Sequence, residues 1–492
     1  MINLIRNEFI KLFKKKSIYI LLVVMFGFIV LNNFLTKEFS TAIIDSSLEE
    51  ANISYLKEEM KTLDKSNPDE KAQYYTDLSE IERYELTKKY KEEWKVSLIN
   101  LKLRDIIYNM NFAKYINNDK ETYNKAKKEY DKFLNDIEKK DWKFFANNDK
   151  KQLENEIKNL NAYKKEADKE EQKSIDEQIK ENKEEIQKIE LRLEKNIPYS
   201  ESYLEEALTN YKKEFPSYEE YKKSLIKEEK KEISKKDEYK TKNKYIEEAT
   251  TNAKSKYMLD NKINLDDAKT LRNTLINTIN DNFIFIIIII ASVAGVIVSS
   301  EFDKGTIKLL LVRPYSRKKI LLSKYIVSLL TILIAIVSAI IMQLIVGGIF
   351  FGFESLSVPV IVYNFTQNKI MNINVFKYIL DNIIAILPQF ILLATLGFTI
   401  SVITNVSTLG VAIPIVGCGA ADIINSIAIL KNVEPLKYFV TLNWNFSNYL
   451  YGGVKSFRGL SLPFSLLICI IYLLIMLIVS FVVFKKRNIK NI

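Results

Sequence analysis

Apolar and polar residues occupy long, separate blocks of this chain. An apolar stretch at Ile18–Leu35 is followed by a block of roughly 247 residues rich in Lys, Glu, Asp and Asn, and then by five more apolar stretches. Those five run approximately over Phe283–Ser300, Ile320–Phe351, Phe376–Ile403, Leu409–Leu430 and Pro463–Phe484. A bilayer accepts such stretches directly, and a helix needs about 20 apolar residues to cross it. The pattern therefore predicts an all-α polytopic membrane protein with six transmembrane helices.

The N-terminal residues 1–17 are typical of an amphipathic helix on the membrane surface. Ile5, Phe9, Leu12 and Phe13 recur at helical spacing, and a run of lysines follows them. For the first apolar stretch, at residues 18–35, a cleaved signal peptide is the alternative. The residues after it lack a small-x-small cleavage site, so we expect an uncleaved anchor.

The polar block at residues 36–282 is predicted to form a large helical domain. It contains almost no glycine and many good helix formers. Between Leu153 and Leu193 the apolar residues recur in steps of three, four or seven, which predicts a coiled-coil seam, most simply an antiparallel hairpin that turns near Ala167–Glu171. Disorder is the alternative because the charge density is high, but aromatic residues at helical spacing argue against it.

The distribution of charge predicts the topology. With a cytosolic N-terminus, the cytosolic segments carry sixteen Lys and Arg against three acids, whereas the whole chain has a net charge of +11. This excess of cations follows the positive-inside rule, so nucleic-acid binding is not needed to explain the basic composition. We expect a bacterial cell-membrane protein with both termini cytosolic and residues 36–282 extracellular.

Enzymatic chemistry has little support in the composition. The chain has no histidine, and its two cysteines, Cys418 and Cys469, lie in apolar stretches. A histidine-based triad is therefore excluded, and a zinc site is disfavoured. The chain also lacks the glycine-rich motif G-x-x-x-x-G-K-[ST] that cradles nucleotide phosphates. We expect no catalytic residues, no metal and no cofactor bound by this chain.

The segment Ser299–Tyr325 between the second and third apolar stretches has the features of a docking element. Glu301 stands where the second stretch ends, Gly305 and Thr306 form a flexible break, and a short apolar helix precedes Pro314. An apolar helix on the cytosolic side can receive a soluble partner. A membrane-surface turn with topogenic charges is the equal alternative on physical grounds alone.

This segment resembles the corresponding loop of the permeases of ABC-2-type exporters. The matching residues are Glu301, Gly305, Thr306, Leu309, Leu310, Pro314, Ser316, Arg317 and Lys324. The resemblance implies that Glu301, Gly305, Thr306, Leu309, Leu310, Pro314 and Arg317 dock an ABC ATPase subunit. It covers roughly the first 35 residues and residues 283–492, and the long polar insertion departs from the simplest members.

Three polar residues within the apolar stretches are candidates for the transport pathway or its gate. Asp422 lies about 21 Å along its helix from the cytosolic end, so an interfacial position near the outer surface is the alternative for it. For Gln343 and Gln389 the alternative is a hydrogen bond between helices, which the residue type favours.

The resemblance implies the permease subunit of an ATP-binding-cassette exporter for a hydrophobic or amphipathic compound or peptide. A partner ATPase would bind ATP and Mg²⁺, and a second permease copy would complete the pathway in the lipid bilayer. The alternative is a membrane-anchored scaffold or receptor whose coiled-coil domain binds another protein. A scaffold has no need of an ATPase-docking loop, so that loop distinguishes the two functions.

Overall fold

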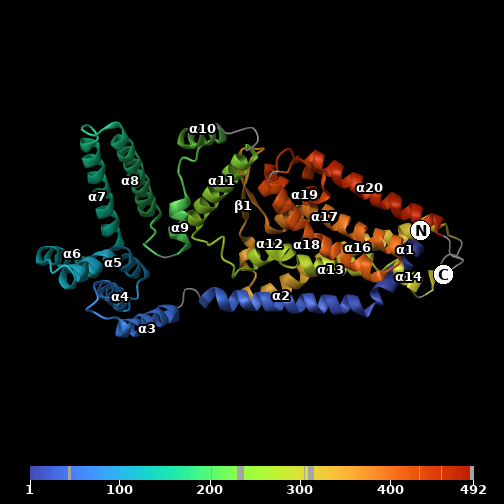
Figure 1. Cartoon of the computed structure of the whole chain (residues 1–492), viewed down its shortest axis with the longest axis horizontal. Coiled ribbons are helices and arrows are strands. Elements are labelled where there is room, and N and C mark those ends of the chain that lie inside the picture. The colour runs from blue at the N-terminus through green and yellow to red at the C-terminus, as the bar shows by residue number, and fades with distance from the viewer. Residues whose placement is uncertain are drawn as a thin grey trace. The chain divides into compact units, whose positions relative to one another are not determined.

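The computed structural model describes residues 1–42, 46–200, 202–229, 238–303, 305–307, 315–431, 433–455 and 457–487. Nearly all of its regular structure is helical (Figure 1). The helices of the first half are α1 (Ile2–Phe13), α2 (Lys16–Ala42), α3 (Ser46–Thr62), α4 (Pro68–Thr87), α5 (Glu93–Tyr115), α6 (Lys120–Lys139), α7 (Trp142–Tyr163), α8 (Lys169–Lys195), α9 (Tyr203–Asn210), α10 (Tyr218–Glu229) and α11 (Glu238–Asn261).

The second half contains longer and more apolar helices. They are α12 (Leu271–Asp281), α13 (Phe283–Ala294), α14 (Ser299–Asp303), α16 (Arg317–Phe351), α17 (Val375–Thr404), α18 (Ser407–Lys431), α19 (Val440–Asn443) and α20 (Leu462–Lys486). Three short 3₁₀ helices, η1 (Glu354–Ser357), η2 (Glu434–Tyr438) and η3 (Ser447–Gly452), lie in the connections.

Within the described residues, five helices are long and apolar enough to cross a bilayer, namely α2, α16, α17, α18 and α20. The second predicted span differs from the expectation, because α13 has only 12 residues, or about 18 Å of helix. It follows α12 after a bend of 42°, and the two make a sixth crossing only if they count as one broken span. The described residues thus form a predominantly helical membrane protein with five candidate spans, or six with the bent pair.

One short element departs from an all-α fold. Strand β1 (Val360–Asn364) pairs antiparallel with β2 (Lys369–Ile373), so that Val360 faces Ile373 and Asn364 faces Lys369. β1 is rich in β-branched residues, which favour a strand, and Asn368 adopts the positive φ of a tight turn. The hairpin lies between α16 and α17, where the sequence analysis expected only a connection.

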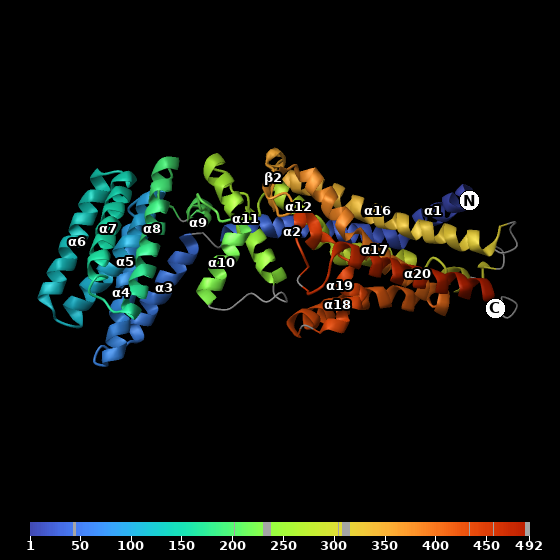
Figure 2. The same ribbon diagram turned by 90° about the horizontal axis from the view of Figure 1, so that it is seen from above.

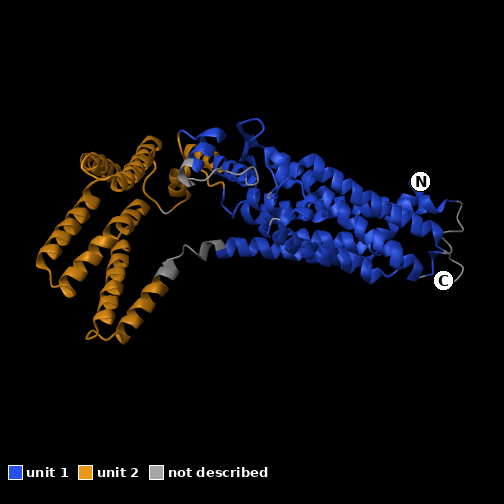
Figure 3. Cartoon of the chain, turned by 45° about the horizontal axis from the view of Figure 1, so that its top comes forward, with its two compact units in different colours: residues 1–40, 214–250, 266–492 blue, residues 41–213, 251–265 orange. Residues whose placement is uncertain are grey.

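The chain divides into two compact units (Figure 3). Unit 1 comprises residues 1–40, 214–250 and 266–492, and unit 2 comprises residues 41–213 and 251–265. The predicted polar domain at 36–282 is therefore shared between them. In unit 1 the aromatic rings of Tyr218, Tyr221 and Tyr245 pack with Tyr363 and Phe365 of the β-hairpin region, so residues 214–250 fold with the membrane helices.

Unit 2 contains the antiparallel helical hairpin that the apolar spacing predicted. Lys150 of α7 pairs with Glu190 of α8 at 2.6 Å, whereas Lys164 at the end of α7 pairs with Asp176 near the start of α8. Residues 164–168 form the turn, and Asp168 caps α8 in a reciprocal hydrogen-bond arrangement with Glu171. The turn therefore comes slightly earlier than the predicted Ala167–Glu171.

Contacts within unit 1 define two opposite ends of its helix bundle. At the first, Arg317 at the start of α16 donates to the backbone carbonyl of Arg487 just after α20, at 2.9 Å. At the second, the backbone N–H of Phe365 after β1 donates to the carbonyl of Tyr451 in η3, at 3.0 Å. We call these the loop end and the hairpin end. Helix α1 and the end of α20 lie at the loop end (Figure 2), and α14 lies there as well (Figure 1).

Candidate functional site

The N-terminal helix α1 turns a mixed face toward the bundle. Its buried residues are Leu4, Glu8 and Leu12, which recur every fourth position and so lie on one side of the helix. Ile5 and Phe9 are partly buried beside this face, whereas Phe13 is exposed. A carboxylate therefore stands in the middle of the surface by which α1 contacts the other helices.

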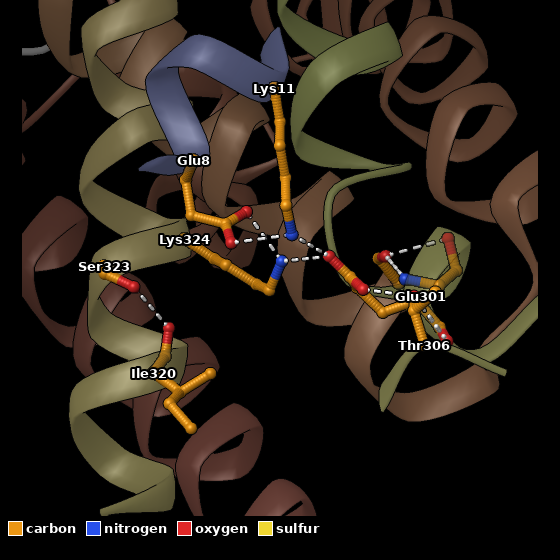
Figure 4. A network of polar contacts seen from close by, with 9 residues as sticks. Glu8, Lys11, Glu301, Thr306, Ile320, Ser323 and Lys324 are labelled. Atoms are coloured by element: carbon orange, nitrogen blue, oxygen red, sulfur yellow. Dashed lines mark hydrogen bonds and ion pairs between the residues drawn. The ribbon is translucent and has the colours of Figure 1, made fainter. Parts of the chain in front are cut away.

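Four charged side chains from three elements meet at the loop end, and we call Glu8, Lys11, Glu301 and Lys324 the charge cluster (Figure 4). The ammonium nitrogen of Lys324 lies 2.7 Å from Glu8 Oε2 and 3.1 Å from Glu301 Oε1. That of Lys11 lies 2.8 Å from Glu301 and 3.3 Å from Glu8. Each lysine thus contacts both glutamates, and the cluster has no net charge.

Three members of the charge cluster are buried to an unusual degree for ionic groups, whereas the side chain of Lys11 is 52% exposed. Lys324 is 1% exposed, Glu301 7% and Glu8 8%. A buried charge costs several kcal/mol unless partners compensate it. Removal of one partner is therefore expected to lower the free energy of unfolding by more than the ion pair itself contributes to stability. Because the partners lie on α1, α14 and α16, these ion pairs connect the three helices to one another.

The electrostatics of Glu301 follow from this arrangement. Burial alone raises the pKa of its carboxyl, but the positive charge of Lys324 and the hydrogen bonds from Lys11, Thr306 and Lys324 outweigh burial and lower the pKa to about 2. Glu301 is therefore ionised throughout the physiological range.

The residues after Glu301 begin the predicted docking segment. Gly305 has a φ of +65°, a conformation that disfavours other residues, and it lets the chain reverse after α14. Thr306 then donates a hydrogen bond back to the Glu301 carboxylate. Of the remaining docking candidates, Leu309, Leu310 and Pro314 lie outside the residues that the structure describes.

Arg317 holds a different position from the charge cluster. Its guanidinium donates to the backbone carbonyls of Lys485 and Arg487 at 3.1 and 2.9 Å. The side chain therefore joins the start of α16 to the end of α20. Ser316 before it caps α16 by accepting a hydrogen bond from the backbone of Lys319.

The three candidate pathway residues lie apart from the charge cluster and in different surroundings. Gln343 is buried and exchanges two hydrogen bonds, at 3.0 and 3.1 Å, with Asn33 of α2. Gln389 is buried, and its side-chain oxygen has no partner among the described residues. Asp422 is exposed and lines a cavity together with Gln389. Gln343 thus joins two helices, while Gln389 and Asp422 share one site.

Sequence reasoning missed two members of the charge cluster as functional partners. Glu8 is one of the three acids, and Lys11 one of the sixteen cations, that the sequence analysis assigned to the cytosolic segments. The signal that marks Glu8 is its place between Leu4 and Leu12 at four-residue spacing, since a carboxylate on a buried face is costly unless a partner compensates its charge.

The fold and these sites define a helical membrane protein whose buried charge cluster joins its N-terminal helix to its membrane helices. Residues 242–490 match the model of a family described as "Protein of unknown function (DUF2705)", and the chain belongs to that family. No solved structure matches the chain.

Two similar proteins come from Bacillus subtilis (strain 168). "Uncharacterized protein YhcI" is 31% identical over 199 residues, which are 40% of this chain and 63% of that protein. "Uncharacterized membrane protein YdbK" is 27% identical over 199 residues, which are 40% of this chain and 75% of that protein. The match thus spans less than two thirds of the first relative, and the name of the second agrees with the apolar helices found here.

Proposed function

We propose that this chain is the permease subunit of an ATP-binding-cassette exporter, and that a separate ATPase docks on the segment that follows Glu301. The observation that carries the proposal is the charge cluster, which fixes the beginning of that segment to α1 and α16. Motion of the segment would therefore be passed to α16, a candidate membrane span.

The same proposal assigns roles to the other docking residues. Gly305 and Thr306 set the direction of the segment, Leu309 and Leu310 are its apolar contact with the ATPase, and Pro314 ends it. Arg317 holds the start of α16 to the end of α20, so movement of the segment would also reach the last helix. ATP and Mg²⁺ would be bound by the ATPase, and a second permease copy would complete the pathway.

An affinity purification of the tagged full chain from detergent, with mass spectrometry of the bound proteins, tests this proposal. The chain carrying Leu309→Glu is compared with the native chain and with Ile370→Glu, a matched control on an exposed position of β2. We expect an ATP-binding-cassette ATPase to bind the native chain and the control, and to be lost with Leu309→Glu. Equal thermal stability of the three chains excludes misfolding as the cause.

The opposite result would favour the scaffold function. Unit 2 is a compact body of its own with an exposed helical hairpin, as an interaction module requires. If no ATPase binds any of the folded chains, the docking proposal is wrong, and a membrane-anchored scaffold or receptor becomes the better account. Without an ATPase partner, the proposed export of a hydrophobic or amphipathic compound or peptide would lose its energy source.

A further inference from the structure

A polar cavity lies at the hairpin end of unit 1, far from the charge cluster along the helices. It has a volume of about 200 Å³ and lies between α17, α18 and the segment from η2 to residue 460. Its polar lining includes Gln389, Asp422, Asn425, Thr441, Asn448 and Lys455. The cavity is large enough for several water-sized groups.

Three buried oxygen atoms of this lining have no hydrogen-bond partner in the described part of the chain. They are Gln389 Oε1, Asn425 Oδ1 and Thr441 Oγ1, three of only eight such side-chain atoms found there. The amide nitrogen of Asn425 donates to the Thr441 carbonyl at 3.2 Å, which leaves the amide oxygen as the unmatched acceptor. A buried acceptor without a partner costs about 1–3 kcal/mol, so these oxygens favour a ligand that brings N–H donors.

Two opposite charges line the same cavity without neutralising each other. Lys455 is 8% exposed, and its ammonium group donates to the carbonyl of Leu442 at 2.5 Å, while Asp422 is exposed. Neither residue has an ion-pair partner within 4 Å among the described residues. Burial lowers the pKa of Lys455 to about 8, so the ammonium form still predominates at neutral pH.

The backbone that carries these groups is fixed to the membrane helices. The N–H of Phe446 donates to the carbonyl of Ala385 in α17 at 2.9 Å. Ser465 of α20 donates to the side chain of Asn443 at 2.8 Å and shares a hydrogen bond with Tyr449. The cavity is therefore a preformed site on a rigid support.

The cavity extends from the middle of the bundle, at Gln389 of α17, toward the hairpin end. Asp422 lies 15 residues after Ser407, or about 22 Å along α18 from the loop end. The hydrocarbon core is about 30 Å thick, so a helix that begins at one surface has about 8 Å of the core left to cross at this point. Trp444 lines the cavity as well, and tryptophan is typical of the boundary between headgroups and hydrocarbon.

We propose that this cavity binds a phosphoethanolamine headgroup, the zwitterionic end of an aminophospholipid. Its primary ammonium brings three N–H donors for the Asp422 carboxylate and the unmatched oxygens of Gln389 and Asn425. Its phosphate is an oxyanion for the buried ammonium of Lys455. The acyl chains stay in the membrane beside α18, whose outer positions Val416 and Ile423 are exposed.

This site does not depend on the proposed ATPase, because lipid binding is a property of the permease chain alone. The two proposals can therefore fail separately. An ATPase can bind a chain that has no lipid preference, and a chain that prefers one lipid can lack an ATPase partner.

Isothermal titration calorimetry of the purified full chain in detergent, with a short-chain phosphatidylethanolamine as the probe, tests the site. Phosphatidylcholine lacks N–H donors, phosphatidylglycerol lacks the ammonium, and free phosphoethanolamine lacks the acyl chains. We expect phosphatidylethanolamine to bind at least about tenfold more tightly than the first two lipids. Free phosphoethanolamine distinguishes a soluble ligand from a lipid: if it binds as tightly as the lipid, the headgroup alone is the ligand, and the membrane source is wrong.

The variants Asp422→Asn, Lys455→Met and Gln389→Leu each remove one contact of the headgroup. Each is expected to weaken phosphatidylethanolamine binding by about tenfold. Glu434→Gln is the matched control, because it removes an exposed carboxylate that pairs with Arg458 on the same segment without lining the cavity. Thermal unfolding identifies any variant that fails to fold.

Two results would overturn the proposal. Equal affinity for the ethanolamine, choline and glycerol lipids would mean that the cavity does not recognise the headgroup. Loss of binding in Asp422→Asn with no change in the folded Lys455→Met would mean that the cavity takes a cation alone, such as the side chain of a cationic peptide, and the zwitterionic ligand would be wrong.

Discussion

At the scale of single residues, the ionisation of Glu301 links the loop end to pH. The carboxyl has a pKa of about 2 in the folded chain and about 4.5 when exposed, so the unfolded chain binds its proton first as the pH falls. Its stabilisation is complete above about pH 4.5 and is lost progressively toward pH 2. Acid should therefore weaken the attachment of α14 to α1 and α16.

The substitution Glu301→Gln isolates this contribution. At pH 7 it should lower the free energy of unfolding by about 3 kcal/mol, because Lys324 and Lys11 each lose a carboxylate partner. Below pH 4.5 the difference between the variant and the native chain should shrink. Thermal unfolding in detergent from pH 7 to pH 3 measures both effects, and a constant difference over this range would contradict the assigned pKa.

The buried amides of Asn33 and Gln343 provide a second residue-scale test. They exchange two hydrogen bonds between α2 and α16, so Asn33→Leu alone leaves Gln343 unpaired. We expect each single leucine substitution to destabilise the chain by about 1–2 kcal/mol and the double substitution to recover most of the loss. Under the exporter proposal, loss of export in Gln343→Leu with an unchanged unfolding temperature would instead assign Gln343 to the pathway.

At the scale of elements, three membrane helices meet through glycines. A Cβ atom on Gly295, after α13, would lie 2.3 Å from the backbone of Gly410 in α18, and one on Gly397 of α17 would lie 2.9 Å from the same residue. Such distances are shorter than any van der Waals contact. Close packing of backbones is a usual source of helix association in membranes.

Gly410→Ala should therefore push α18 away from α13. We expect a loss of about 1–3 kcal/mol in the free energy of unfolding, the usual cost of overpacking. Gly417→Ala on the same helix is the control, because its Cβ would meet nothing within 4 Å, and it should be neutral or slightly stabilising. The free energies of unfolding of both variants are measured in the same detergent. Equal changes in the two variants would mean that helix propensity, rather than close packing at Gly410, is responsible.

The elements differ in how far the sequence alone could predict them. The long apolar helices α16, α17, α18 and α20 lie where the hydrophobic blocks lie, because burial in lipid leaves a continuous signal. The bend at Asn282 was not predicted, because the sequence analysis assigned the polar residues before Phe283 to the polar domain and began the span at Phe283. The β-hairpin was missed because its strands are only five residues long.

The charge cluster shows the same limit for a site. Glu301 and Lys324 stand in a recognisable pattern, but their partner Glu8 lies 316 residues from Lys324 in sequence. No local periodicity encodes such a distant pair. The four-residue spacing of Leu4, Glu8 and Leu12 indicates only that Glu8 is buried, and the identity of its partner comes from the fold.

At the scale of the whole molecule, the polar block at residues 36–282 is divided between the two compact units. Most of it forms unit 2, but residues 214–250 pack through Tyr245 against Tyr363 in unit 1. The sequence analysis did not locate this division, because both parts are polar and rich in Lys and Glu. The tyrosines around Tyr221 and Tyr245 are the trace of the second core, visible only once their partner strand is known.

The side of the membrane on which each end lies is the prediction on which the proposed function depends. In a chain whose Cys418 and Cys469 are replaced by alanine, single cysteines are placed at Tyr163, exposed in unit 2, and at Lys319, exposed at the loop end. If the positive-inside rule holds, a membrane-impermeant maleimide should label position 163 in intact cells and position 319 only after permeabilisation. The reverse pattern would place the charge cluster and the docking segment outside the cell, where no ATPase could reach them. The exporter proposal would then be wrong, whatever the resemblance of the loop.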